Sequence, residues 1–212
     1  MTRAPYALAS LLIVAACRAG SREIPTAAAP VILFFGDSIT RGQGLDESQA
    51  FPAVIQGKLA AAGLDYRCVN AGVSRNTTAD GLGRLDEARG LHPRVVMVEL
   101  SANDGWQGLN RLQTRDNLLK IVRAFSDDGA HVILAGTQFP HLQHPAYVLA
   151  LGREFEEIAK KTGADLIPDL MTGVASVRDL NQEDGLHPTA EGQQRLAETA
   201  WPVVEHAVQS AH

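Results

Sequence analysis

Three short polar segments of this chain hold residue types that together could carry out nucleophilic catalysis. The first contains Ser38, the second contains Asn103, and the third holds Asp184 and His187 three positions apart. A serine hydroxyl becomes a nucleophile when a neutral histidine accepts its proton, and a carboxylate on the other ring nitrogen fixes the tautomer and stabilises the imidazolium. In a turn, a separation of three residues can bring an Asp and a His into contact. Ser38, Asp184 and His187 are therefore a candidate catalytic triad.

Each segment also has an ordinary structural interpretation. Residues 36–40 read Gly-Asp-Ser-Ile-Thr, and Ser or Asp often caps the start of a helix. Asn103 could aim its amide at a developing oxyanion, but Asn, Asp and Gly also cluster in turns. Residues 184–188 could be a surface turn with an incidental histidine. No segment decides the question alone, so the elements that position them matter.

From residue 31 onward, short apolar runs alternate with segments of helical spacing. Strands are expected at 31–35, 66–69, 95–100, 131–135 and 166–167. Helices are expected at 51–62, at 79–89, at 114–128 with Thr114 as N-cap, at 146–161, and at 191–208 after an opening at Thr189. This alternation predicts an α/β fold, a three-layer α/β/α sandwich around a parallel sheet of about five strands. In such sheets ligands bind beyond the carboxyl ends of the strands, where the first two polar segments lie.

Four segments, in this order, resemble sequence blocks of the SGNH (GDSL) hydrolases. Residues 36–39 resemble the nucleophile block, residues 70–78 (NAGVSRNTT) the second block, Asn103-Asp104 the oxyanion block, and Asp184-x-x-His187 the acid–base block. The resemblance runs from about Val31 to the end of the chain. It is closest to the branch of small bacterial esterases with thioesterase, lysophospholipase and arylesterase activities.

The resemblance implies a flavodoxin-like SGNH hydrolase fold and a serine esterase that hydrolyses carboxylic esters or thioesters without a metal or organic cofactor. The backbone N–H groups of Ser38 and Arg75 and the side-chain amide of Asn103 would then form the oxyanion hole. Two alternatives stay open. One is a carbohydrate O-acetylesterase, and the other is a non-catalytic binding module on the same fold.

Two residues depart from the family pattern, because Arg75 and Ser101 stand where the family usually has glycine. An arginine still offers its backbone N–H, although a positive φ at that position would strain it. Ser101 adds a side chain where the family leaves space, which would narrow the site or add a hydrogen bond. Both departures bear on the substrate more than on the mechanism.

Several aromatic and apolar residues follow the third and fourth expected strands. Trp106, Leu109 and Phe139 are candidate substrate-binding residues, and the alternative is that Trp106 and Leu109 only pack their loop. His141 and His144 are three positions apart, but metal ligation would need a third ligand and none is indicated. No metal site is expected.

The N-terminal segment has the pattern of an export signal. Arg3 supplies a positive start, and residues 7–16 form an apolar run too short to span a bilayer as a mature helix. The run ends in Val-Ala-Ala-Cys, which resembles the lipobox of bacterial lipoproteins and marks Cys17 for lipidation. The alternative is an ordinary signal peptide cut nearby. Either reading predicts an exported protein of the periplasm or cell envelope, and the first predicts a lipid anchor.

The expected organisation is a signal peptide at 1–17, a flexible tether at 18–30 and a single hydrolase domain at 31–212. Composition fits this organisation, because 45% of the 212 residues are hydrophobic and 20% are charged. The net charge of −5 and the lack of a Lys/Arg run argue against a nucleic-acid partner. A small-molecule ester or thioester is the expected partner, and a monomer the expected state. With Cys17 modified or removed, Cys68 has no disulfide partner and is expected to be a buried apolar residue.

Overall fold

The computed structural model describes Met1, residues 29–138 and residues 145–211. Five parallel strands form one sheet in the order β2-β1-β3-β4-β5. They are β1 (Val31–Gly36), β2 (Arg67–Asn70), β3 (Val95–Glu99), β4 (His131–Ala135) and β5 (Asp165–Ile167). The strand order reverses between β1 and β3, because the chain first builds outward to β2 and then returns to the other side of β1. Such a reversal opens a crevice beyond the carboxyl ends of the two strands.

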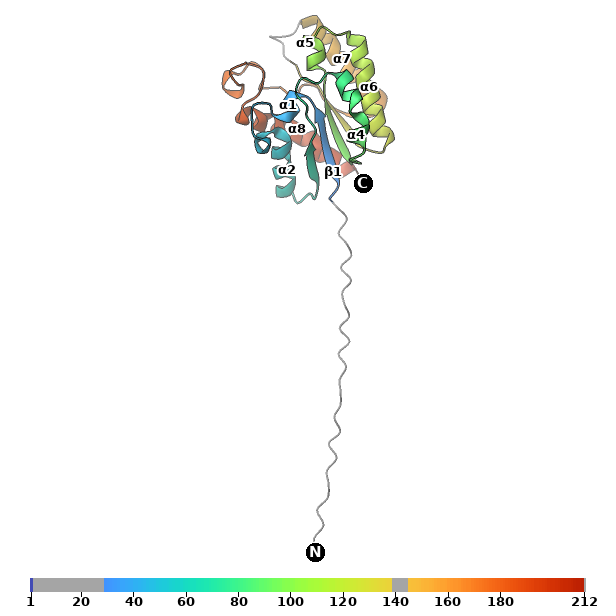
Figure 1. The fold of residues 1–212 in the computed structure, drawn as a ribbon, viewed down its shortest axis with the longest axis vertical. Coiled ribbons are helices and arrows are strands. Elements are labelled where there is room, and N and C mark those ends of the chain that lie inside the picture. Colours follow the sequence, from blue (N-terminus) through green and yellow to red (C-terminus); the bar gives the residue numbers. More distant parts are fainter. Residues whose placement is uncertain (2–28, 139–144, 212) are drawn as a thin grey trace.

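Helices cover both faces of this sheet (Figure 1). One face carries α2 (Phe51–Ala61) and α8 (Ala190–Ser210), and the other carries α3 (Thr78–Gly83), α4 (Leu85–Arg89), α6 (Arg111–Asp127) and α7 (Pro145–Thr162). Two short helices follow the strands at the reversal point, namely α1 (Ser38–Arg41) after β1 and α5 (Ala102–Trp106) after β3. Two 3-10 turns span Glu47–Gln49 and Arg178–Leu180. The three-layer α/β/α prediction is confirmed.

The two cores alternate along the central strands, as a sheet buried on both faces requires. On β1, Phe34 faces α2 and packs edge-on against Phe51 at a ring separation of 5.4 Å. Its neighbour Phe35 faces α6 and packs edge-on against Phe125 at 5.6 Å. Ring pairs of this geometry add to the burial energy of the two cores. The carboxyl end of β1 is therefore fixed from both sides.

Two predicted helices differ from the observed ones. The helix expected over 79–89 is two short helices, because the chain breaks at Arg84, whose side chain turns inward. The helix expected from 114 begins three residues earlier, with Asn110 as N-cap accepting from the backbone of Leu112 at 2.9 Å. Thr114 is buried inside this helix, where its hydroxyl donates to Asp104 at 3.0 Å. The prediction of Thr114 as N-cap was therefore wrong.

Some of the predicted features lie outside the described residues. These are the signal peptide beyond Met1, Cys17, most of the 18–30 tether, Phe139, and the His141 and His144 pair. Within the described part of the chain, no helix is long and apolar enough to cross a membrane. In the same part, no group of three His, Cys, Asp or Glu side chains is placed to hold a metal ion.

Candidate active site

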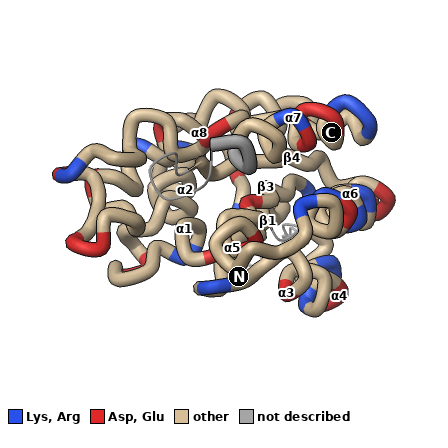
Figure 2. Tube along the Cα trace, turned by 90° about the horizontal axis from the view of Figure 1, so that it is seen from above, with Lys and Arg blue, Asp and Glu red and all other residues tan. Residues whose placement is uncertain are grey.

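Ser38 stands at the carboxyl end of β1, as the first residue of α1. Asp37 caps this helix, because its side chain accepts the backbone N–H of Ile39 at 3.0 Å. Before it, Gly36 has no room for a side chain, since a Cβ there would overlap Thr40 and Glu99. Both interpretations of this segment from the sequence are therefore correct. Asp37 caps the helix, and this helix holds Ser38 at the carboxyl end of β1, on the side of the sheet that Figure 2 views from above.

The three residues of the candidate triad are brought into one chain of hydrogen bonds. The Nε2 atom of His187 lies 3.0 Å from Oγ of Ser38, and Nδ1 of His187 lies 2.6 Å from Oδ2 of Asp184. Ser38 and His187 are buried, at 5% and 7% exposure, while the Asp184 side chain is half exposed. This is the geometry that a proton transfer from serine to histidine requires.

The turn that carries Asp184 also controls its protonation. Its Oδ1 atom accepts hydrogen bonds from the backbone N–H groups of Leu186, at 2.9 Å, and His187, at 3.0 Å. Burial opposes the charged form, but the hydrogen bonds from His187 and Leu186 outweigh it and lower the pKa of the Asp184 carboxyl. Asp184 therefore stays ionised at neutral pH and is oriented by the same turn that presents the histidine.

Gln182 fastens this turn to the loop after the nucleophile helix. Its backbone N–H donates to the carbonyl of His187 at 2.7 Å. Its side-chain amide donates to the carbonyls of Gln43 at 2.7 Å and Pro188 at 2.9 Å. The serine and the histidine are 149 positions apart in the chain, so a tie of this kind sets their relative position.

Asn103 lies in α5, directly after β3, and its side-chain amide reaches toward the nucleophile segment. Nδ2 donates to Oδ2 of Asp37 at 3.1 Å and to the backbone carbonyl of Asn76 at 2.9 Å. The amide thus bridges the segment before Ser38 and the loop that contains Arg75. Ser38, at the first position of α1, has a backbone N–H that the helix cannot use. The three segments that carry the candidate oxyanion donors therefore lie next to one another at the reversal point of the sheet.

Arg84 connects three parts of this region with one guanidinium group. It donates to the carbonyl of Gly36 at 2.8 Å, to the carbonyl of Ala71 at 2.9 Å and to Oδ1 of Asn76 at 2.7 Å. The group also lies 3.8 Å from the ring centre of Phe35, a cation–π contact. Sequence reasoning missed Arg84, because it looked like one more residue of a surface helix.

A pair of buried carboxyl groups lies behind the serine. Glu99, fully buried at the end of β3, accepts from the hydroxyls of Thr40 at 2.7 Å and Thr137 at 2.6 Å and from the backbone of Asp37 at 3.4 Å. Burial raises the pKa of Glu99, and burial together with the charge of Glu99 raises the pKa of Asp37 well above its usual range. A charged residue ending an apolar strand was the signal that could have identified Glu99.

Known proteins share the sequence pattern and the fold of this chain. Residues 34–195 match the model of the GDSL-like lipase/acylhydrolase family. The chain belongs to that family. It is 37% identical over 195 residues to esterase TesA of Pseudomonas aeruginosa, covering 92% of this chain and 97% of the relative. It is 32% identical over 187 residues to thioesterase 1/protease 1/lysophospholipase L1 of Escherichia coli K12, covering 85% and 88%. A crystal structure of TesA superimposes with a TM-score of 0.80 at 38% identity, covering 84% of this chain and 99% of that one.

Family membership makes the chain a serine esterase, a carboxylic ester hydrolase. Its two departures from the family pattern both have a positive φ, 69° at Arg75 and 130° at Ser101. Glycine adopts such angles freely, whereas other residues are strained by about 1–3 kcal/mol. Ser101 is fully buried and its hydroxyl has no hydrogen-bond partner within the described residues. The hydrogen bond considered for Ser101 is not made there.

Of the three candidate substrate-binding residues, the structure describes two. Trp106 is half-buried and packs against the core on the α2 and α8 side of the sheet. Leu109 is 40% exposed and lines a hollow of about 320 Å³ against the start of α6. A larger hollow, about 730 Å³, borders the acid–base turn and is lined by residues 176–179, 181–183 and 185. Trp106 therefore helps to pack α5, whereas Leu109 is exposed at the surface of this smaller hollow.

Proposed function

We propose that this esterase acts by two-step acyl transfer with Ser38 as nucleophile. The Ser38 hydroxyl oxygen attacks the carbonyl carbon of an ester or thioester while Nε2 of His187 takes the hydroxyl proton. Asp184 holds the proton on Nδ1 and stabilises the imidazolium that forms. The proton then passes from Nε2 to the departing alcohol or thiol, which leaves an acyl-serine. The 3.0 Å and 2.6 Å contacts of His187 support these roles.

Water then hydrolyses the acyl-serine, with His187 acting first as a base and then as an acid. His187 removes a proton from the water as its oxygen attacks the acyl carbon, and returns that proton to Ser38 when the acid leaves. We propose that the protein carries out this cycle as a monomer. No metal or organic cofactor enters either step.

The negative charge of each tetrahedral intermediate falls on the former carbonyl oxygen. We assign its stabilisation to the backbone N–H groups of Ser38 and Arg75 and to Nδ2 of Asn103. In the structure Nδ2 donates to Asp37 and to the Asn76 carbonyl, so the oxyanion must share or replace one of these acceptors. The oxyanion is a stronger hydrogen-bond acceptor than the Asn76 carbonyl, because the oxyanion carries a full negative charge and the carbonyl does not.

The hydrogen-bonded chain from Ser38 through His187 to Asp184 is the single observation that carries the proposal. A fluorophosphonate probe tests it, because such probes form a bond only with an activated serine. Ser38→Ala should abolish both probe labelling and ester hydrolysis while leaving the thermal unfolding transition in place. Labelling of the Ser38→Ala protein at the wild-type rate would assign the activity to another residue. No labelling of the wild type would contradict the role of Ser38 as an activated nucleophile.

The finer substrate class belongs to the proposal as well. The relatives are named esterase TesA and thioesterase 1/protease 1/lysophospholipase L1, which supports acyl esters, thioesters or lysophospholipids as substrates. A third relative, 29% identical, is named arylesterase. Nitrophenyl esters from acetyl to long acyl, an acyl thioester and acetylated sugars should be compared by kcat/KM. Preference for the acetylated sugars would favour the carbohydrate O-acetylesterase.

We also propose that the protein is exported and anchored to the cell envelope through Cys17, on the sequence pattern that ends at this residue. A lipid on this thiol would tether the folded domain by the segment before β1. Cys17→Ser should move the protein from the membrane fraction to the soluble periplasmic fraction. Recovery of the wild-type protein wholly in the soluble fraction would contradict the anchor and leave the export signal standing.

A further inference from the structure

Arg75 is held in a backbone conformation that suits glycine, and its backbone N–H does not require arginine. Its φ is 69°, so a glycine would offer the same donor without strain. Strained residues persist where the surrounding structure and the function of the site demand them. A functional reason for an arginine at this position must therefore lie in its side chain.

The loop that carries Arg75 is fixed against the nucleophile segment at two points and against α5 at a third. The backbone N–H of Val73 donates to the carbonyl of Gly36 at 3.1 Å. Gly72 lies against the backbone of Arg41 so closely that a Cβ would collide with it. On the other side of Arg75, the carbonyl of Asn76 accepts from Nδ2 of Asn103 at 2.9 Å. Arg75 is thus anchored between the nucleophile segment and the oxyanion amide.

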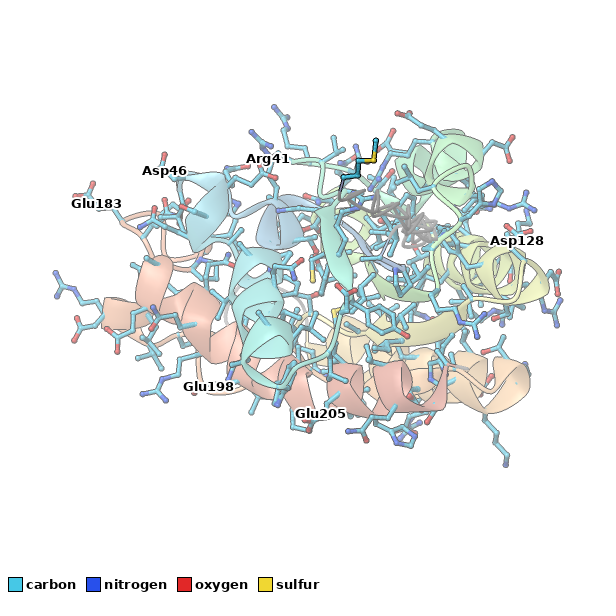
Figure 3. All side chains as sticks on the ribbon, turned by 90° about the horizontal axis from the view of Figure 1, so that it is seen from below. Arg41, Asp46, Asp128, Glu183, Glu198 and Glu205 are labelled. Atoms are coloured by element: carbon cyan, nitrogen blue, oxygen red, sulfur yellow. The ribbon has the colours of Figure 1, made fainter. Side chains whose placement is uncertain are left out.

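A second arginine borders the same place. Arg41 ends α1, three residues after Ser38, and both Arg41 and Arg75 are exposed. Neither guanidinium has a hydrogen bond or an ion pair with another described residue. Figure 3 labels Arg41 on the outline of the molecule, on the same part as Asp46 and away from Asp128 and Glu198. The protein has a net charge of −5. Arg41 and Arg75 are therefore two exposed positive charges on a negatively charged protein, and the segments that carry them are in contact next to the nucleophile helix.

We propose that Arg75, with Arg41 beside it, forms a subsite for an anionic group close to the cleavable bond of the substrate. A guanidinium presents a planar fork of donors that matches a carboxylate or a phosphate. The substrate class is therefore an ester that carries such a group, and Arg75 determines this specificity. The inference rests on the proposed function, because the subsite is defined as the place next to the proposed nucleophile Ser38.

Matched substrate pairs test the subsite in the full-length protein. In one arm, 4-acetoxybenzoate is compared with its neutral methyl ester. In the other, a monoacylglycerol 3-phosphate is compared with the monoacylglycerol of the same chain. The readout is the ratio of kcat/KM for the anionic ester to that for the neutral one, which cancels general effects on the oxyanion hole. The two arms separate a carboxylate from a phosphate as the preferred group.

Arg75→Gly removes the guanidinium and suits the positive φ, so the variant should fold. Arg41→Gln removes the second cation, and Arg123→Gln, at an exposed position on α6, is the control with the same change of net charge. In at least one arm the ratio should fall on the order of tenfold for Arg75→Gly, the effect of one charge-assisted hydrogen bond. It should fall less for Arg41→Gln and not at all for Arg123→Gln.

The proposal is overturned if Arg75→Gly leaves the ratio unchanged in both arms, or if Arg123→Gln lowers it equally, since that would be a general field effect. Arg75→Lys gives a second check, because an ammonium keeps the charge but loses the fork and should retain only part of the ratio. Failure of the proposed function would look different. Ser38→Ala would then still hydrolyse the neutral esters, whatever the ratios were.

Discussion

Asp184 holds His187 through two separate oxygens. Oδ2 lies 2.6 Å from the ring atom Nδ1, while Oδ1 accepts the backbone N–H of the same residue at 3.0 Å. One carboxylate therefore shapes the turn and fixes the ring tautomer together. These two tasks can be separated by substitution.

Asp184→Asn should keep the turn but no longer hold the His187 ring in the tautomer that carries its proton on Nδ1. An asparagine still offers Oδ1 to the backbone, but its NH₂ group opposes Nδ1–H and favours the tautomer that carries its proton on Nε2. That tautomer cannot accept the Ser38 proton. We expect kcat to fall by roughly 10²–10⁴ with an almost unchanged melting temperature. Asp184→Ala loses both tasks and should also melt earlier; equal activity of Asp184→Asn and wild type would remove Asp184 from the mechanism.

Arg84 should act as a positioning residue. Arg84→Lys leaves one ammonium to serve the three acceptors on Gly36, Ala71 and Asn76, which a single point charge cannot reach together. We expect a fall in kcat with little change in KM, and a loss of stability of roughly 2–4 kcal/mol from the broken hydrogen bonds.

Chemical rescue separates positioning from general stability for Arg84. Millimolar methylguanidinium should restore part of the kcat of Arg84→Ala, because the free ion can occupy the vacated place. It should not restore the Asn103→Ala variant, which lacks a donor of its own and should lose roughly 10²–10³ in kcat. If the ion restores neither kcat nor stability of Arg84→Ala, the positioning role is refuted.

Arg84 and the triad differ in how well the sequence alone predicts their contacts. The strand ends and the three-residue spacing of Asp184 and His187 could be predicted, because apolar runs and local turns are encoded within a few residues. The contacts of Arg84 could not, since they depend on how segments at 36, 71 and 76 approach one another. The start of α6 was missed for a similar reason. Asn110 and Thr114 are both good N-caps, and Asp104, from another helix, captures the Thr114 hydroxyl.

Cys68 should be unreactive in the folded protein. It is half-buried and packs against the core on the α2 side, and burial raises the pKa of its thiol to about 12. Since the thiolate is the reactive form, alkylation by iodoacetamide at pH 8 should be far slower than in urea-unfolded protein. Alkylation at the unfolded rate would place Cys68 in a more open environment.

Ser101→Gly should stabilise the protein. Glycine relieves the φ of 130° and removes a buried hydroxyl that has no described partner. Against this gain stands the greater freedom of glycine in the unfolded chain, so we expect a net increase of about 1 kcal/mol in the free energy of unfolding. Urea denaturation of the two proteins measures it. A loss of stability would contradict the strain that we assign to Ser101.

The buried carboxyls of Asp37 and Glu99 predict how stability depends on pH. Both pKa values are raised in the folded protein by burial, that of Asp37 also by the charge of Glu99, whereas in the unfolded chain an Asp titrates near its ordinary value of about 3.9. Between these values the folded state binds more protons than the unfolded state. The free energy of unfolding therefore falls as pH rises through this window, by up to about 1.4 kcal/mol per pH unit for each proton held.

Asp37→Asn should remove much of this slope. The asparagine oxygen can still accept from Ile39, as Asp37 does at 3.0 Å, so the helix cap survives while the buried charge is lost. Unfolding in urea should be followed from pH 4.5 to pH 8 for the wild type, for Asp37→Asn, and for Asp46→Asn as an exposed control. The stability of Asp37→Asn relative to wild type should rise with pH, and that of Asp46→Asn should not. A parallel slope for wild type and Asp37→Asn would show that the Asp37 carboxyl holds no extra proton in the folded state.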